Sequence, residues 1–147
     1  MALRDKIRQV IGVKDSPRKI AFSFALGVFI GMSPILGLHT VLGILVAWIF
    51  KLNKFVTLVG VYVTNPWTIV PIYTFATWLG GRILGMEHIL PEIDWHNAGI
   101  MDLIRDLEPI LPPFILGTVF LGLVSGIVGY IVIYHSVVRQ RKLGNNK

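Results

Sequence analysis

Three long apolar segments dominate the pattern of hydrophobic and polar positions. They span residues 20–50, 55–84 and 110–138, and Arg82 is the one charged residue within them. Each is longer than the roughly 20 residues that cross a bilayer as a helix. The pattern predicts an all-α integral membrane protein that combines broken or re-entrant helical hairpins with full transmembrane helices.

The first segment is interrupted at Gly31-Met32-Ser33-Pro34. Pro34 has no amide hydrogen and disfavours the helical conformation at Ser33, so a continuous helix is not expected here. Lys51 and Lys54 follow the segment, and basic residues favour the cytoplasmic side. We therefore expect residues 20–50 to form a broken hairpin, entering as one helix and returning as another from residue 35.

The second segment is interrupted at Thr64-Asn65-Pro66-Trp67-Thr68. Asn65 precedes a proline, so we expect it to be extended and to cap a helix that starts at Pro66. The first amides of that helix would carry a partial positive charge into the membrane, where an anion could bind. Residues 55–85 are predicted to be either one broken helix or a hairpin followed by a span.

Peptide groups freed at such breaks cannot face lipid, so they must be buried in protein or line a wet cavity. We therefore predict a ligand site between the two breaks. His39 in this site could titrate near physiological pH and couple protons, or it could be an ordinary helix-packing group. The predicted lining residues are Ser33, Pro34, His39, Thr40, Thr64, Asn65, Trp67 and Thr68.

Composition supports the membrane class and narrows the chemistry. The 147 residues are 54% hydrophobic and 15% charged, unlike a soluble domain. The absence of cysteine excludes disulfides and thiolate chemistry. No catalytic triad, carboxylate pair or metal cluster is recognisable at membrane depth, so we predict no enzyme, no catalytic residues, no cofactor and no metal.

The net charge of +6 is unevenly distributed. Basic residues precede the first segment and follow the last, whereas acidic residues gather in residues 86–109. Under the positive-inside rule both termini are cytoplasmic and the acidic loop is external. This predicts a multi-pass protein of a bacterial or archaeal cytoplasmic (inner) membrane. The same bias accounts for the basic charge without a nucleic-acid partner.

The flanking regions also carry signals. Residues 1–19 form a basic amphipathic segment whose start suits a short helix on an anionic leaflet, or alternatively a solvated tail. Residues 100–107 suit an interfacial helix that Pro109 ends. Arg82 is expected to reach the interface and pair with Glu87. Residues 110–138 are expected as a transmembrane helix, and residues 139–147 as a basic cytoplasmic tail.

Glycines at helical spacing predict close helix packing. Gly122 and Gly126, with Gly129 one turn later, lie on one face of the third segment. Gly27 and Gly31 have the same spacing in the first segment and are the expected partners. Packing within the chain and contact with a second copy both stay open.

The motifs Gly27-Val28-Phe29-Ile30-Gly31-Met32-Ser33-Pro34, Leu52-Asn53-Lys54 and Thr64-Asn65-Pro66-Trp67-Thr68 support a family resemblance. Over roughly residues 15–140 the chain resembles the prokaryotic integral membrane family catalogued as domain of unknown function 2062. The resemblance implies one membrane domain over residues 1–147 and indicates no activity.

Two functions agree with this pattern. The first is a transporter or flippase-like module that takes an anionic lipid or small solute between two discontinuous helices. Its partners would be membrane lipids. The second is a non-catalytic scaffold or accessory subunit of a larger membrane complex. Its breaks would only turn the chain, and its partner would be a second copy or another membrane protein.

Overall fold

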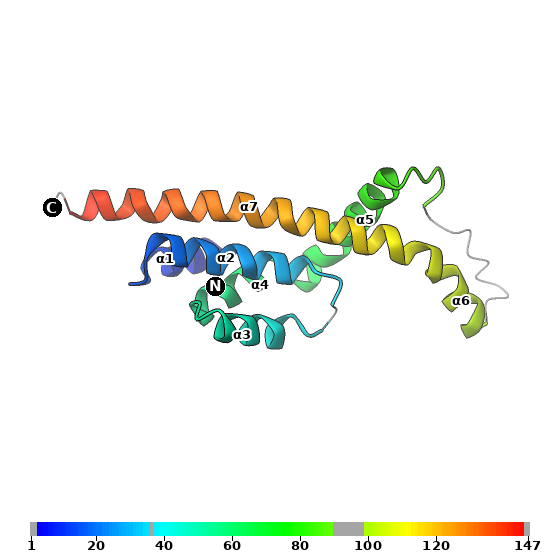
Figure 1. Cartoon of the computed structure of the whole chain (residues 1–147), viewed down its shortest axis with the longest axis horizontal. Coiled ribbons are helices and arrows are strands. Elements are labelled where there is room, and N and C mark those ends of the chain that lie inside the picture. Colours follow the sequence, from blue (N-terminus) through cyan, green and yellow to red (C-terminus); the bar gives the residue numbers. More distant parts are fainter. Residues whose placement is uncertain (1–2, 36, 90–98, 146–147) are drawn as a thin grey trace. The chain divides into compact units, whose positions relative to one another are not determined.

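The computed structural model describes residues 3–35, 37–89 and 99–145, which form helices and no strands (Figure 1). The all-helical prediction is confirmed. Two compact units are present, one containing the chain up to Asn65 and from Gly122, the other Pro66–Leu121. The helices are α1 (Leu3–Ile11), α2 (Pro17–Met32), α3 (His39–Ile49), α4 (Lys54–Val61), α5 (Pro66–Ile83), α6 (Ile100–Leu107) and α7 (Leu111–Gly144).

The interruption of the first apolar segment is present in the first unit. Helix α2 ends at Met32, just before the Ser33-Pro34 pair that disfavours a helix. The returning helix α3 begins at His39 rather than at residue 35, so the predicted start is wrong. Gly37 has a φ of 83°, a left-handed conformation that prevents the helix from starting sooner.

Helices α2 and α3 form an antiparallel hairpin, and α4 then runs parallel to α2 (Figure 1). The backbones of α2 and α4 touch where they cross. A methyl group on Gly27 would collide with the Thr57 carbonyl oxygen, and one on Gly60 with the Phe24 carbonyl oxygen. A Cβ on Gly31 would lie 2.6 Å from the Val61 carbonyl oxygen. Two helices can approach this closely only through glycine.

The predicted partner of Gly27 and Gly31 is therefore wrong, because both face α4 rather than the third segment. Helix α7 packs antiparallel on another side of α2. A Cβ on Gly126 would lie 3.1 Å from the Ala25 carbonyl oxygen, and one on Gly129 would lie 3.1 Å from the Phe24 ring. The glycines of α7 thus pack against side chains and backbone of α2 within the chain.

The two ends of the first unit compare differently with the prediction. At the N-terminus α1 is amphipathic as expected, but Val10 on its apolar side is fully buried and α1 packs against α4. Ile7 and Ile11 on the same side are half-buried, and contact of α1 with a leaflet stays a prediction. At the C-terminus α7 continues to Gly144, so residues 139–144 are helical and not a tail.

In the second unit α5 packs against the first turns of α7. A methyl group on Gly80 would collide with the Pro113 carbonyl oxygen, and one on Gly117 with that of Ala76. Helix α6 ends at Leu107 as predicted. The chain does not leave helical structure at Pro109, because a 3-10 turn over Glu108–Ile110 connects α6 directly to α7.

Candidate site at the helix interruptions

The interruptions of the first two apolar segments meet in the first unit. The Thr64 hydroxyl, just beyond the end of α4, lies 2.9 Å from the Gly31 carbonyl oxygen of α2 and 3.0 Å from that of Val61. It therefore donates its proton between the last turns of two helices. The break in α2 leaves the Gly31 carbonyl without its partner in the helix, and the Thr64 hydroxyl from the second break donates to it instead. A buried carbonyl group needs such a partner.

The start of α3 adds two polar contacts to the same end. His39 Nε2 lies 3.2 Å from the Ser33 carbonyl oxygen and donates to it in the tautomer protonated at that atom. The hydroxyl oxygens of Thr40 and Tyr62 lie 3.0 Å apart. The Ser33 hydroxyl donates to the Ile30 carbonyl at 2.7 Å. Side chains from three helix ends thus supply the partners that the interrupted backbone lacks.

Of the predicted lining residues, Ser33, His39, Thr40 and Thr64 are brought together, with Pro34 half-buried beside them. The start of α5 at Pro66 is confirmed. Asn65 has an interaction partner, and its capping role stays a prediction. The other two predicted residues, Trp67 and Thr68, belong to the second unit.

Tyr62 is a contact residue that sequence reasoning missed. It lies at the C-cap of α4, and its ring faces the Lys6 ammonium at 5.8 Å from the ring centroid. Helix α1 therefore places a cation beside the aromatic side chain that bonds Thr40. The signal in the sequence was weak, because a single tyrosine in an apolar run belongs to no recognisable motif.

A second polar cluster, also missed, lies at the opposite end of α2. The Asp15 carboxylate accepts hydrogen bonds from Asn53 Nδ2 at 2.7 Å and from Lys19 Nζ at 3.2 Å. The backbone amide of Asn53 donates to the Ser23 hydroxyl at 3.1 Å. The start of α2 is thus tied to the start of α4, whose Val56 amide is capped by the same asparagine.

Arg141 completes this cluster from the end of α7. Its Nη2 donates to the carbonyl oxygens of Val13 at 3.0 Å and Asp15 at 2.5 Å. The hydrogen bond from Asn53, and then that from Lys19, lower the pKa of the Asp15 carboxyl below its ordinary value. The sequence did offer a signal for this cluster, because Asn53 is a polar residue between Lys51 and Lys54, where two apolar segments are joined.

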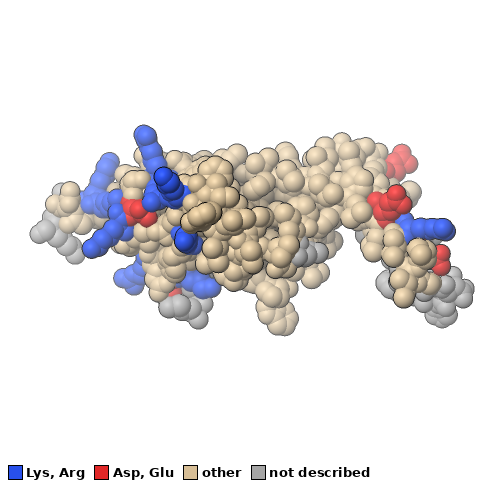
Figure 2. All heavy atoms as spheres, turned by 60° about the horizontal axis from the view of Figure 1, so that its bottom comes forward, with Lys and Arg blue, Asp and Glu red and all other residues tan. Residues whose placement is uncertain are grey.

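The charges are arranged accordingly. Lys and Arg side chains gather at the end of the first unit that holds the start of α2 and the end of α7 (Figure 2). The interruptions lie at the other end of α2. Lys and Arg side chains are thus concentrated at one end of this unit. The polar contacts of the interruptions lie at the other end, where Lys6 is the cation beside Tyr62.

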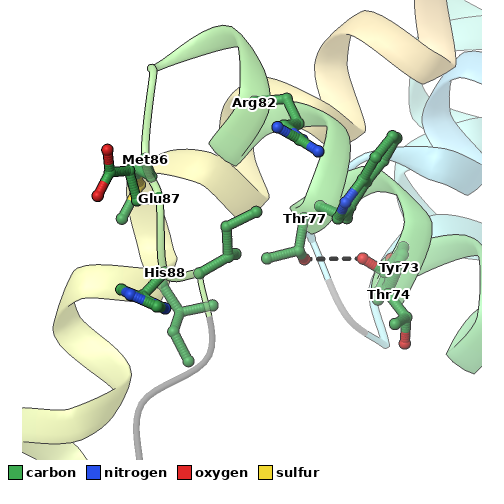
Figure 3. Close-up of a pocket in the computed structure, with 10 residues that line it drawn as sticks. Tyr73, Thr74, Thr77, Arg82, Met86, Glu87 and His88 are labelled. Carbon is green, nitrogen blue, oxygen red and sulfur yellow. Dashed lines mark hydrogen bonds between the residues drawn. The ribbon is translucent and has the colours of Figure 1, made fainter.

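Arg82 is not paired with Glu87, so that prediction is wrong. The guanidinium lies over the Trp78 ring, 5.6 Å from its centroid, and no ion pair joins Arg82 to Glu87 in the described chain. The Glu87 carboxylate points away from the guanidinium (Figure 3). A cation–π contact with a neighbour on the same helix replaces the expected salt bridge.

The fold is thus all-helical, and one continuous helical stretch of the described chain, Ile100–Gly144, is long and apolar enough to cross a membrane. Helices α4 and α5 meet the same criterion only when they are taken together as a bent pair. The chain belongs to the bacterial family described as "Uncharacterized protein conserved in bacteria (DUF2062)", whose model matches residues 1–144. The resemblance seen in the motifs is confirmed. No curated protein and no solved structure matches the chain.

Proposed function

We propose that this is a multi-pass integral membrane protein with α2 and α3 as a re-entrant hairpin, α4 and α5 as a broken span and α7 as a full span. Helix α3 supports this placement, because Val41, Trp48 and Ile49 are 64%, 66% and 58% exposed. Exposed apolar surface of this kind is costly in water and suits contact with lipid.

The depth of the interruptions follows from helix length. Helix α4 has eight residues and begins at Lys54. At about 1.5 Å per residue it rises about 12 Å, somewhat less than half of an about 30 Å hydrocarbon layer. With Lys54 at the cytoplasmic interface, the contact between Thr64 and Gly31 lies near the bilayer midplane. Both termini then face the cytoplasm of a bacterial inner membrane.

We further propose a transporter or flippase-like module for an anionic lipid or small solute. The observation that carries this proposal is the meeting of the two interruptions through Thr64 and Gly31 and through Thr40 and Tyr62. Discontinuous helices with polar ends near the midplane are a recurring way for transporters to bind anions and ions. The first amides of α3 have no side-chain cap and supply donors at this place.

The same contacts suggest how the site could work. The hydroxyls of Thr40, Tyr62 and Thr64 can donate to a ligand's oxygens in place of their present acceptors, and a hydroxyl group of the ligand can donate to the freed Gly31 carbonyl oxygen. His39 lies beside the break in α2, with Nε2 3.2 Å from the Ser33 carbonyl oxygen, and is placed to contact such a ligand. A ligand at this position would separate the ends of α2 and α4 while keeping each polar group bonded.

Reconstitution tests the transport proposal. Full-length protein in proteoliposomes is assayed for movement of a fluorescent phosphatidylglycerol across the bilayer and for uptake of radiolabelled glycerol phosphate. We expect movement of one probe above protein-free vesicles and a severalfold loss in His39→Ala and Asn65→Ala. Ser136→Ala, at a hydroxyl that bonds its own helix α7, is the matched control. Movement of neither probe would contradict transport, and unchanged rates would remove His39 and Asn65 from the mechanism.

The scaffold alternative has an observation of its own. A groove of about 420 Å³ between α2 and α7 is bounded almost wholly by apolar groups, including Phe22, Phe29, Leu123 and Ile127. An apolar helix of another membrane protein would fit such a surface. Purification in mild detergent separates the proposals, because a scaffold would carry a stoichiometric protein partner and a transporter would carry lipid.

A further inference from the structure

The second unit contains a cavity that the proposed transport site does not use. Its volume is about 630 Å³, and it lies between the C-terminal half of α5 and residues 86–89, with Ile110 at its edge (Figure 3). Thr77 and Arg82 reach it from α5, and His88 from the following segment. Aromatic and apolar groups, the Arg82 guanidinium, the His88 imidazole and the Glu87 carboxylate therefore line one hollow.

The walls of this cavity are fixed by close packing. Gly80 and Gly117 bring the backbones of α5 and α7 into direct contact, as described above. The Ile89 side chain lies against Gly81, where a Cβ would come within 2.6 Å of it. The segment after α5 is thereby held against the helix, and the hollow beside Arg82 is a preformed feature of the unit.

Arg82 is the charged donor of the cavity. Its guanidinium lies over the Trp78 ring, and the Glu87 carboxylate points away from it. The hydroxyl protons of Thr74 and Thr77 are already donated to the carbonyl oxygens of Val70 at 2.8 Å and Tyr73 at 2.7 Å. Within the described residues no carboxylate forms an ion pair with Arg82. Such an arginine is suited to an anion, because its planar fork matches phosphate oxygens.

We propose that this cavity binds a phosphate-bearing anion. The Arg82 guanidinium donates to the phosphate oxygens, and the Trp78 ring keeps that guanidinium in place through the cation–π contact. The anion is either a lipid headgroup or a soluble phosphate ester, and the chemistry of recognition is the same. Placement of the cavity at the outer interface rests on the proposed membrane topology. Anion binding itself requires neither that topology nor transport.

Binding is measured on the full chain purified in a non-ionic detergent. Isothermal titration uses three probes, namely dihexanoyl phosphatidylglycerol, glycerol 3-phosphate and inorganic phosphate. We expect Arg82→Gln to weaken binding by about tenfold or more, the usual scale for loss of a charge-assisted hydrogen-bonded pair. Arg82→Lys should retain part of the affinity, because it keeps the charge and loses the fork. Arg105→Gln on α6 removes the same charge outside the cavity and should leave affinity unchanged.

A second variant protects the test against misfolding of Arg82→Gln. Met86→Glu adds a second carboxylate to the cavity wall beside Glu87 and should repel the same probe without removing Arg82. Binding of the lipid alone would identify a headgroup site, and binding of all three probes would identify a site for the phosphate group itself. Failure of every probe to bind, or equal losses in Arg82→Gln and Arg105→Gln, would overturn the proposal. The transport proposal is tested separately, because it concerns lipid movement that depends on His39 and not binding at Arg82.

Discussion

The Thr64 hydroxyl lies 2.9 Å from the Gly31 carbonyl oxygen, and this contact joins the ends of two interrupted helices that are 33 residues apart in sequence. Gly31 itself permits the approach, because a Cβ there would lie 2.8 Å from the same hydroxyl oxygen. The absence of a side chain on one residue thus makes room for the hydrogen bond from the other. Both residues belong to motifs in which proline follows within three positions.

Thr64→Val keeps the shape of the side chain and removes its proton. The Gly31 carbonyl then loses its partner, and we expect the first unit to be destabilised by about 1 kcal/mol. Thr74→Val is the matched control, because that hydroxyl donates only to Val70 of its own helix. Thermal unfolding in detergent followed by circular dichroism measures both. Equal changes in the melting temperatures of the two variants would show that the hydrogen bond between the breaks does not stabilise the first unit.

Gly60→Ala should disrupt the crossing of α2 and α4. The added methyl group meets the backbone carbonyl of Phe24, which cannot move away as a flexible side chain would. We expect a loss of about 1–3 kcal/mol or failure to fold. In Gly12→Ala the new methyl group meets only carbonyl oxygens at 3.5 and 3.6 Å, an ordinary contact. A Gly60→Ala protein that melts like Gly12→Ala would refute the close crossing.

Arg141→Gln should release the segment between α1 and α2. The guanidinium donates to the carbonyl oxygens of Val13 and Asp15, and a shortened neutral side chain cannot reach both. We expect faster cleavage by a protease within residues 12–16. Arg139→Gln removes the same charge from an exposed position on the same helix and serves as the control. Identical cleavage rates for both variants would argue against the Arg141 contact.

The Asp15 contacts predict a pH dependence. Because hydrogen bonds from Asn53 and Lys19 lower the folded-state pKa below the ordinary 3.8, the ionised carboxylate stabilises the folded chain above that pH. This contribution disappears as the pH falls from 3.8 through the lower folded-state value. Asp15→Asn should therefore melt at a lower temperature than the wild type at pH 6, and the difference should shrink below pH 3.8.

Asp5→Asn is the control for this pH series, because no hydrogen bond to Asp5 is described. It should melt like the wild type throughout. A constant difference between Asp15→Asn and the wild type from pH 6 down to pH 3 would show that the carboxylate charge is not what stabilises the cluster.

The sequence predicted the helix interruptions because proline and glycine act locally. Pro34 and Pro66 determine by their own chemistry where α2 ends and α5 begins. The start of α3 was misplaced because Pro34 is followed by Gly37, whose left-handed conformation becomes evident only in the folded chain. Local rules thus located the breaks and underestimated the length of one of them.

Partners across the fold were harder to predict. Gly27 and Gly126 lie on α2 and α7 with the spacing of a packing motif, yet Gly27 faces α4. A glycine pattern indicates that some helix approaches closely and does not say which one. The Asp15–Asn53 pair joins residues 38 positions apart, and no local rule links them. Most site residues near the breaks were predictable, since His39 and Thr64 are among the polar side chains beside the interruptions, whereas Tyr62 was missed.

The central claim is that the interruptions lie inside the bilayer at about half its depth, and a nitroxide at the start of α3 tests it most directly. Because the chain has no cysteine, Leu38→Cys and Lys51→Cys each give one labelling site. Power-saturation electron paramagnetic resonance in liposomes compares collisions with oxygen and with a water-soluble nickel chelate. We predict that the label at position 38 lies about 12 Å or more deeper than the label at position 51. Equal access of the nickel chelate to both labels would contradict the account.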